Sequence, residues 1–311
     1  MKKYITRRVL ISIATLLMIL LMLFILMDLM PGSPFNDEKL TEAQLALLYQ
    51  KYGLDKPILV RFFLYVKNML SGDLGVSYAI NKNFAIADML KGRFSISLTV
   101  GAMAMVIGTI LGLTLGILAA INHNTWIDTV CSVISVIGVS VPSYVAALLL
   151  AYYVAFKLQL LPILYNQSMP IKSLLLPALA LSVSPTANIA RFTRSEMIDV
   201  MNSDYILLAQ SKGIKNYKLI IRHALRNTLI PIITVMGPIL VNLLTGSSVI
   251  EKIFGIPGIG SLMISGIQQN DYNVTIACSF IYSLMYIVTM LIVDILYGVI
   301  DPRIRVSKGG A

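Results

Sequence analysis

Long apolar stretches separated by polar segments run along the whole chain. Six stretches lack Asp, Glu, Lys and Arg and approach or exceed the roughly 20 mostly apolar residues that a membrane-spanning helix needs. They are Val9–Met27, Phe94–Ile121, Thr129–Phe156, Ser173–Ala190, Asn227–Ile250 and Tyr272–Val293. Their apolar residues do not alternate with polar ones as barrel strands require, and backbone groups in hydrocarbon must bond to one another. We therefore predict an all-α integral membrane protein with six transmembrane helices.

The composition supports this prediction. Hydrophobic residues make up 57% of the 311 positions and charged residues only 13%, against about 25% charged residues in soluble domains. A cytosolic enzyme, a secreted domain and a disordered regulator are excluded on this ground. The first apolar stretch follows basic residues as a secretion signal would, but it ends in Asp28–Pro31 instead of a small-residue cleavage site. We expect it to be a retained anchor.

The distribution of basic residues predicts the topology. The net charge is +10, and excess Lys and Arg usually mark cytoplasmic segments. Basic residues concentrate at the N-terminus, in Arg191–Arg226 and near the C-terminus, whereas the short loops on the other side hold only Lys157, Lys172 and Lys252. We therefore expect both termini in the cytoplasm.

These spans divide the chain into predicted parts. Residues 1–30 form the cytoplasmic N-terminus and first span, 31–93 an external cap, 94–306 a five-helix core, and 307–311 a tail. The core includes a cytoplasmic segment over 191–226 and an external loop rich in Gly and Pro over 252–271.

Small residues and prolines mark the helix interiors. Gly108, Gly112 and Gly116 recur every four residues and put a narrow face on span two, where another backbone can approach closely. We expect this face to serve helix packing, with a sliding interface as the alternative. Prolines interrupt spans three, four and five and predict bends around a cavity; they are Pro142, Pro177, Pro185, Pro231 and Pro238.

No catalytic or metal-binding pattern is present in the sequence. His123 and His223 form no zinc motif, Cys131 and Cys278 are far apart in apolar stretches, and no nucleotide-binding Gly-x4-Gly-Lys-Ser/Thr motif occurs. Asp28 and Asp294 lie at span edges, and the span centres hold no acid, which argues against proton coupling. We predict that the chain is not an enzyme and holds no metal or cofactor.

The segment between spans four and five is too charged to cross a membrane. Ser203 or Asp204 is expected to cap a short helix over Tyr205–Lys212, which Gly213 ends. A second helix, about Tyr217–Arg226, leads into span five at Pro231. Four residues of the short helix share one side: Tyr205, Leu208, Ala209 and Lys212. From the residues alone, a basic amphipathic segment on anionic lipid and a docking element for a cytoplasmic partner both remain open.

This segment resembles the coupling motif of ABC-importer permeases of the peptide/nickel subfamily. The matching residues are Asp204, Tyr205, Ala209, Lys212, Gly213, Arg222, His223, Ala224, Leu225, Arg226, Asn227 and Pro231. Further matching blocks are Tyr52–Pro57, Gly72–Ser77, Phe254–Gly260 with Pro257 and Gly258, Asp271–Tyr272, and Asp301–Arg305. Two positions depart from the pattern: Leu208 precedes Ala209 where other importers have Ala, and Asn273 follows Tyr272 where the family has Pro.

The resemblance implies the type I ABC importer permease fold and a place in the bacterial inner (plasma) membrane. The long segment after span one is similar to that of the first, or B-type, subunit of an oligopeptide or dipeptide importer. Such a subunit forms half of a pore with a second permease. Two cytoplasmic subunits bind ATP and Mg, and an extracytoplasmic binding protein delivers the cargo.

The resemblance also implies roles for single residues. Asp204 would cap the docking helix, Ala209 and Gly213 would be small to fit a cleft of the ATPase, and Lys212 would contact the ATPase or lipid. Tyr205 and Leu208 would complete the coupling surface. Arg222, His223, Arg226, Asn227 and Pro231 would support it, and Phe254, Pro257, Gly258 and Gly260 would form the external loop. Nickel or a metal chelate is the alternative cargo; a stand-alone proton-coupled carrier and a membrane scaffold are the alternatives of another class.

Overall fold

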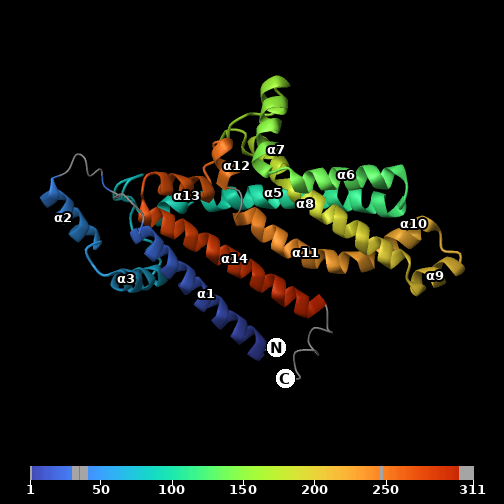
Figure 1. Ribbon diagram of the computed structural model, residues 1–311, viewed down its shortest axis with the longest axis horizontal. Helices are drawn as coiled ribbons and strands as arrows, with labels where there is room; N and C mark the ends of the chain where they lie inside the picture. Colours follow the sequence, from blue (N-terminus) through green and yellow to red (C-terminus); the bar gives the residue numbers. More distant parts are fainter. Residues whose placement is uncertain (1, 30–34, 36–40, 246–247, 301–311) are drawn as a thin grey trace. The chain divides into compact units, whose positions relative to one another are not determined.

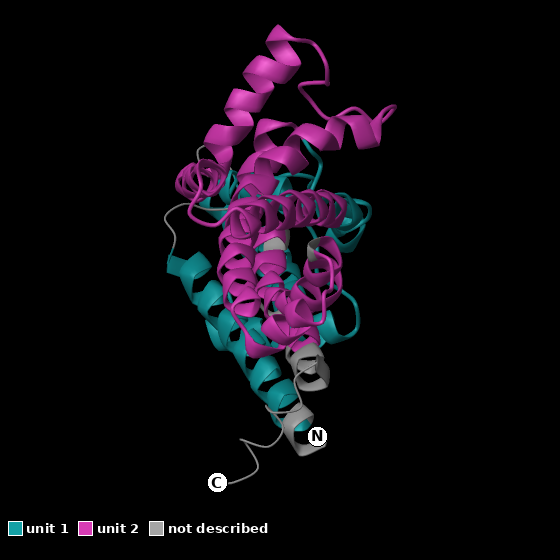
Figure 2. Ribbon diagram, turned by 90° about the vertical axis from the view of Figure 1, so that its right-hand side faces the viewer, with its two compact units in different colours: residues 1–97, 256–288 teal, residues 98–255, 289–311 magenta. Residues whose placement is uncertain are grey.

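The computed structural model describes residues 2–29, 35, 41–245 and 248–300. The predicted tail over 307–311 and the Asp301–Arg305 block lie outside these residues. Within the described part, every extended regular element is a helix, and the sole bridge of strand type joins Val76 to Ala85. The chain forms two compact units (Figure 2): unit 1 comprises residues 1–97 and 256–288, and unit 2 comprises residues 98–255 and 289–311.

Unit 1 combines the first and last long helices with the segment predicted as an external cap. Its helices are α1 (Lys2–Leu29), α2 (Glu42–Tyr52), α3 (Ile58–Leu70), α4 (Ile86–Leu90), the start of α5 (Arg93–Ile121), α13 (Ile259–Gln268) and much of α14 (Tyr272–Ile300). Helix α3 lies along the C-terminal part of α1 (Figure 1), where Phe24 meets the rings of Phe62 and Tyr65 edge-on. Asp28 closes this contact with an ion pair of 2.7 Å to Arg61, so it is a helix-end partner.

A second core of unit 1 gathers around α13. Ile86 of α4, Leu262 of α13 and Ala277 of α14 are buried together. Residues 252–271 were expected to form a loop, and this expectation is wrong for twelve of them, two at the end of α12 (Ser248–Ile253) and ten in α13. Apolar positions such as Ile259 and Leu262, three residues apart, face this core and stabilise a helix.

A buried carboxylate ties two distant segments of unit 1 together. Asp271 is fully buried and accepts a hydrogen bond of 2.5 Å from the Ser77 hydroxyl. Its carboxylate also accepts the backbone N–H groups of residues 78, 79 and 80 at 2.9–3.1 Å. Asn273, which departs from the family pattern, donates from its side-chain amide to the Val76 carbonyl at 3.1 Å, a bond that the side chain of a proline, which has no donor, cannot make.

Unit 2 holds the remaining helices. They are the rest of α5, α6 (Trp126–Ser140), α7 (Ser143–Leu150), the π-helix η2 (Ala151–Lys157), α8 (Pro170–Met201), α9 (Asp204–Ser211), α10 (Asn216–Lys218), the π-helix η3 (Leu219–Ala224), α11 (Leu225–Thr245) and α12 (Ser248–Ile253). Figure 1 shows α8 and α11 running toward the end of the unit where α9 and α10 lie.

The glycines of span two lie against α8. A Cβ placed on Gly108 would be 2.7 Å from Cβ of Pro185, and one on Gly112 would be 2.8 Å from Cβ of Ile189. For Gly116 the corresponding distance, to Thr193, is 2.5 Å. Real Cβ atoms do not approach this closely, so the three glycines allow the α5 and α8 backbones to pack at this separation.

The six predicted spans correspond to four long helices and two bent pairs. Among the described residues, α1, the α4–α5 region, α8 and α14 are each long and apolar enough to cross a bilayer. Two bent pairs raise the number to six: α6 with α7–η2, and Leu219–Ile233 with Val235–Ile253. The second pair bends by 51° within α11, between Pro231 and Pro238, where the prolines of span five predicted a bend. The first pair bends by 103° next to Pro142, which precedes α7. The break predicted at Pro142 is thus confirmed, whereas α8 continues through Pro177 and Pro185.

Candidate functional site

The segment singled out from the sequence forms a tight helical turn, residues 203–214, which we call the α9 turn. Ser203 occupies the N-cap position in an extended conformation, but its hydroxyl donates to the Val200 carbonyl at 2.5 Å and accepts no helix N–H. Asp204 is the first residue of α9. The expectation that Asp204 caps the helix is therefore wrong: its carboxylate acts from the first turn, where negative charge is favoured by the helix dipole.

One side of α9 is buried in the chain itself. Ile206 is fully buried and Ala209 is nearly so, in a cluster with Met197 of α8 and with Leu219 and Ala224 of η3. Ala209 was expected to be small so that it fits a partner's cleft. Its burial gives a different reason: a larger side chain would collide with α8 or η3. The helix is fixed to both neighbouring segments through this face.

The other side of α9 is open. Tyr205 is 42% exposed and Leu208 is 56% exposed, and Lys212 is exposed at the helix end. Leu207 is also 56% exposed. Three large side chains are thus bare on a helix of eight residues, and the side that carries Tyr205 and Leu208 offers apolar surface for a partner.

Gly213 reverses the chain after α9. Its φ is +74°, in the left-handed region that other residues rarely adopt, and its N–H bonds to the Gln210 carbonyl at 2.9 Å. Nothing lies within 4 Å of where its Cβ would be. Within this chain the need for glycine therefore comes from the backbone conformation.

The returning segment is helical from Asn216 onward, so the second helix is longer than the predicted Tyr217–Arg226. It contains the π-helix η3, a kind of helix that is often found at functional positions. Asn227 donates from its amide to the Tyr205 hydroxyl at 2.9 Å and so links α11 to α9. The other predicted supporting residues are spread along this segment, with Arg222 and Arg226 exposed and His223 and Pro231 half-buried.

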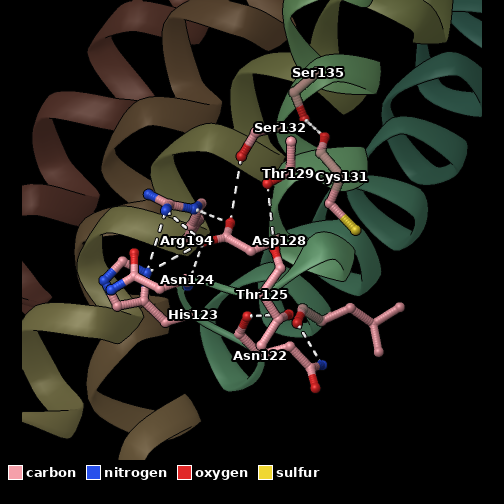
Figure 3. Close-up of polar contacts among 11 residues, drawn as sticks. Asn122, His123, Asn124, Thr125, Asp128, Thr129, Cys131, Ser132, Ser135 and Arg194 are labelled. Carbon is pink, nitrogen blue, oxygen red and sulfur yellow. Dashed lines mark hydrogen bonds and ion pairs between the residues drawn. The ribbon is translucent and has the colours of Figure 1, made fainter.

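An ion pair that the sequence analysis missed lies near this end of unit 2 (Figure 3). The Asp128 carboxylate, in the first turn of α6, is 7% exposed and accepts from Nε and a terminal nitrogen of Arg194 at 2.6 and 2.7 Å. His123 Nδ1 lies 3.2 Å from the same carboxylate, and the Asn124 N–H donates to it at 3.0 Å. These contacts hold α8 to the start of α6. In the sequence, this pair could have been found as two opposite charges, an Asp just before predicted span three and an Arg just after predicted span four.

The predicted external-loop residues are packed inside their units. In unit 2, Phe254 is fully buried and its carbonyl accepts the Tyr165 N–H at 2.9 Å. In unit 1, Gly258 precedes α13 and Gly260 is buried within it, while Pro257 is half-buried. Within unit 2, Phe254 is not part of the buried cluster that contains Ile206 and Ala209 of α9. Among the described residues, no group of three or more His, Cys, Asp or Glu side chains is placed to hold a metal ion.

Known proteins resemble the chain along its whole length. A model of the family described as binding-protein-dependent transport system inner membrane component matches residues 112–306, and a model of the N-terminal part of such components matches residues 1–99. The dipeptide transport system permease protein DppB of Lactococcus lactis is 41% identical over 309 residues, covering 98% of this chain and all of that protein. The oligopeptide transport system permease protein OppB of Salmonella typhimurium is 39% identical over 306 residues, with 98% and 100% covered.

Solved structures agree on the fold. An inward-facing structure of the MetNI methionine ABC transporter aligns with a TM-score of 0.57 at 16% identity, covering 68% of this chain and 96% of that one. The expected type I importer permease fold is confirmed, as is the B-type resemblance. The chain belongs to the family of inner membrane components of binding-protein-dependent transport systems, and it is a multi-pass protein of the bacterial inner membrane.

Proposed function

We propose that this family member is one of two permease subunits that together form the pore of an ATP-driven peptide importer. The names of the relatives that match over their full length favour dipeptides or oligopeptides over nickel or a metal chelate as cargo. In this proposal an extracytoplasmic binding protein delivers the peptide, two cytoplasmic subunits bind and hydrolyse ATP, and both termini of this chain lie on the ATPase side.

The observation that carries the proposal is the two-sided character of α9. Its inner side, Ile206 and Ala209, is buried with residues of α8 and η3, and its outer side exposes Tyr205, Leu208 and Lys212. A basic segment resting on lipid needs only an apolar face and flanking cations. The α9 turn instead directs its apolar anchor into the chain and presents a second apolar surface outward, as a docking element requires.

Mechanical coupling follows from this packing. A protein interior is densely packed, so a displacement of α9 is transmitted to the segments that share its buried cluster. Met197 lies in α8, and Leu219 and Ala224 lie in η3, which continues into α11. The Arg194–Asp128 pair extends the connection from α8 to α6. Closure of the ATPase subunits against α9 would therefore tilt three helices of unit 2 together, while the chemistry of ATP hydrolysis stays in the partner subunits.

The matched pair of variants Leu208→Glu and Leu207→Glu tests this surface. Both leucines are 56% exposed, and adjacent residues point about 100° apart around a helix, so a similar effect on the stability of the chain is expected. If the Tyr205–Leu208–Lys212 side is docked, Leu208→Glu buries an unpaired charge and lowers peptide-stimulated ATP hydrolysis and peptide uptake of the reconstituted complex roughly tenfold or more. Leu207→Glu is expected to change both by less than about threefold.

Equal losses in the two variants, or normal coupling in Leu208→Glu, would refute the assignment of this face. Ala209→Trp is not a useful substitute, because it would disrupt the internal cluster whether or not a partner binds. Uptake by the chain alone in vesicles, driven by a pH gradient, would instead support a proton-coupled carrier. Binding of a cytoplasmic protein without transport in any combination would support a scaffold.

A further inference from the structure

Unit 1 contains a cavity of about 340 Å³ between the C-terminal end of α1, helices α2 and α3, and the start of α14. Its lining combines apolar and charged side chains. Phe24 and Met27 come from the predicted first membrane span, whereas Lys51 and Lys56 come from the segment predicted to lie outside the membrane. The cavity thus brings apolar and basic residues together inside a single compact unit.

The lining of the cavity carries an excess of positive charge. Lys51, Lys56 and Arg61 belong to it together with one acid, Asp73. The guanidinium of Arg61 pairs with Asp28 through one nitrogen at 2.7 Å, which leaves other donors of its five N–H groups for a ligand. With Asp28 counted as well, three cations face two anions, so the cavity favours an anionic group.

A buried hydroxyl in the cavity wall lacks a partner. The Tyr65 side chain is 9% exposed, and its Oη has no hydrogen-bond partner among the described residues. Burial raises the pKa of Tyr65 and raises that of the neighbouring Tyr78 to about 12, so both phenols are protonated donors at neutral pH. Leaving such a group unpaired is costly, and an acceptor atom of a bound ligand would remove that cost.

Aromatic residues surround the same cavity. Tyr52, Tyr78 and Tyr272 line it, and the rings of Tyr52 and Tyr78 lie 4.7 Å apart. Tyrosine is enriched where membrane proteins pass from hydrocarbon to water, because its ring is apolar and its hydroxyl polar. Cations, a phenol donor and an adjoining apolar wall are together the features that bind an amphiphile with a negatively charged head.

We propose that this cavity binds the phosphate head group of an anionic phospholipid, with the acyl chains leaving it beside Leu64, an exposed apolar residue of its lining. The phosphate oxygens accept from Tyr65 and from the basic side chains of the lining. Bound lipid would then fix the first span to the helices α2 and α3. Nothing in this inference depends on the cargo or on the ATPase partners.

Native mass spectrometry of the 311-residue chain in detergent tests the proposal. Phosphatidylglycerol is expected to remain bound at a stoichiometry of one under conditions that remove phosphatidylcholine. The double variant Lys51→Gln/Lys56→Gln should weaken retention about 30-fold, since each basic residue near an anionic lipid contributes about fivefold. Tyr65→Phe, which removes only the hydroxyl, should weaken it about threefold or more. Lys67→Gln is the matched control, because Lys67 is an exposed lysine of α3 that does not line the cavity.

Thermal unfolding supplies a second measurement that is independent of retention. Phosphatidylglycerol should stabilise the parent chain and the Lys67→Gln control, and should stabilise Tyr65→Phe less. Soluble glycerol phosphate should compete only weakly, because it lacks acyl chains; equal competition would assign the site to a free phosphate instead. Equal retention of the two lipids, unchanged retention in the double lysine variant, or a peptide found in the cavity would each overturn the proposal.

Discussion

Removing Arg194 tests whether the ion pair with Asp128 holds the α9 end of unit 2 together. Arg194→Gln deletes two short charged hydrogen bonds, of 2.6 and 2.7 Å, to a carboxylate that is 7% exposed. The carboxylate keeps the Asn124 N–H and the neighbouring His123, so it is not left without partners. The loss is therefore smaller than that of stranding an isolated buried charge.

The magnitude follows from the geometry. A hydrogen bond to a charged group contributes about 1.5–3 kcal/mol, and water screens part of the effect because the Arg194 side chain is 31% exposed. We expect Arg194→Gln to lower the free energy of unfolding by about 2–4 kcal/mol. Asp128→Asn should cost less, about 1–3 kcal/mol, because the freed guanidinium can reach solvent.

The tryptophan Trp126 provides a local assay, since it lies two residues before Asp128 and is the sole tryptophan of the sequence. Its fluorescence transition on heating in detergent should fall by roughly 4–12 °C in Arg194→Gln. In a double-mutant cycle with Asp128→Asn, the coupling energy should be about 1–3 kcal/mol. Additive effects of the two substitutions, or a transition within about 1 °C of the parent, would refute the reasoning.

Two further predictions concern the packing of α5 against α8 and the buried carboxylate of Asp271. Gly112→Ala should lower the free energy of unfolding by about 1–3 kcal/mol despite the better helix propensity of Ala, because the new Cβ would lie 2.8 Å from Cβ of Ile189. Thermal unfolding measures this loss, with Leu111→Ala on the exposed side of α5 as the control. An unchanged or raised unfolding midpoint in Gly112→Ala would contradict the prediction. Asp271→Asn should cost about 2–4 kcal/mol by placing an amide among N–H and O–H donors. Limited proteolysis of the segment around Ser77 should then become faster than in the Asp88→Asn control, which breaks only an exposed pair with Lys91; equal rates would argue against the role of Asp271.

The spans could be predicted from the sequence because lipid imposes a simple rule on composition. The predicted Phe94–Ile121 differs by one residue from α5, and the predicted start at Tyr272 is the start of α14. The bend in span three was also foreseeable, because Pro142 lacks an N–H for the preceding turn. At Pro177 and Pro185 the helix is not interrupted: α8 continues through both, and most of its membrane-spanning part is buried against neighbouring segments.

The tertiary contacts of the candidate site could not be predicted in this way. Helical spacing placed Tyr205, Leu208 and Ala209 on one side of α9, but it gave no information about which part of the helix the chain itself covers. Burial of Ala209 depends on Met197 and Leu219, whose positions follow from the packing of other segments. The bond from Ser77 to Asp271 spans 194 positions, and no periodic pattern contains such a pairing.

Two of the buried carboxylates, Asp128 and Asp271, indicate how the position of a helix along its neighbours is fixed. Asp128 lies in the first turn of α6, and Asp271 directly precedes α14, where the helix dipole favours negative charge. Each is satisfied by groups far away in the sequence but within its own unit. Apolar contacts are not directional, so two helices in lipid can slide along one another at small cost. A carboxylate with several fixed donors permits one position only, because any slide leaves it buried and unpaired. The register of these helices is therefore determined by a few polar residues at their ends. For this reason, substitutions of these polar residues should alter function more than changes of equal size along the apolar faces.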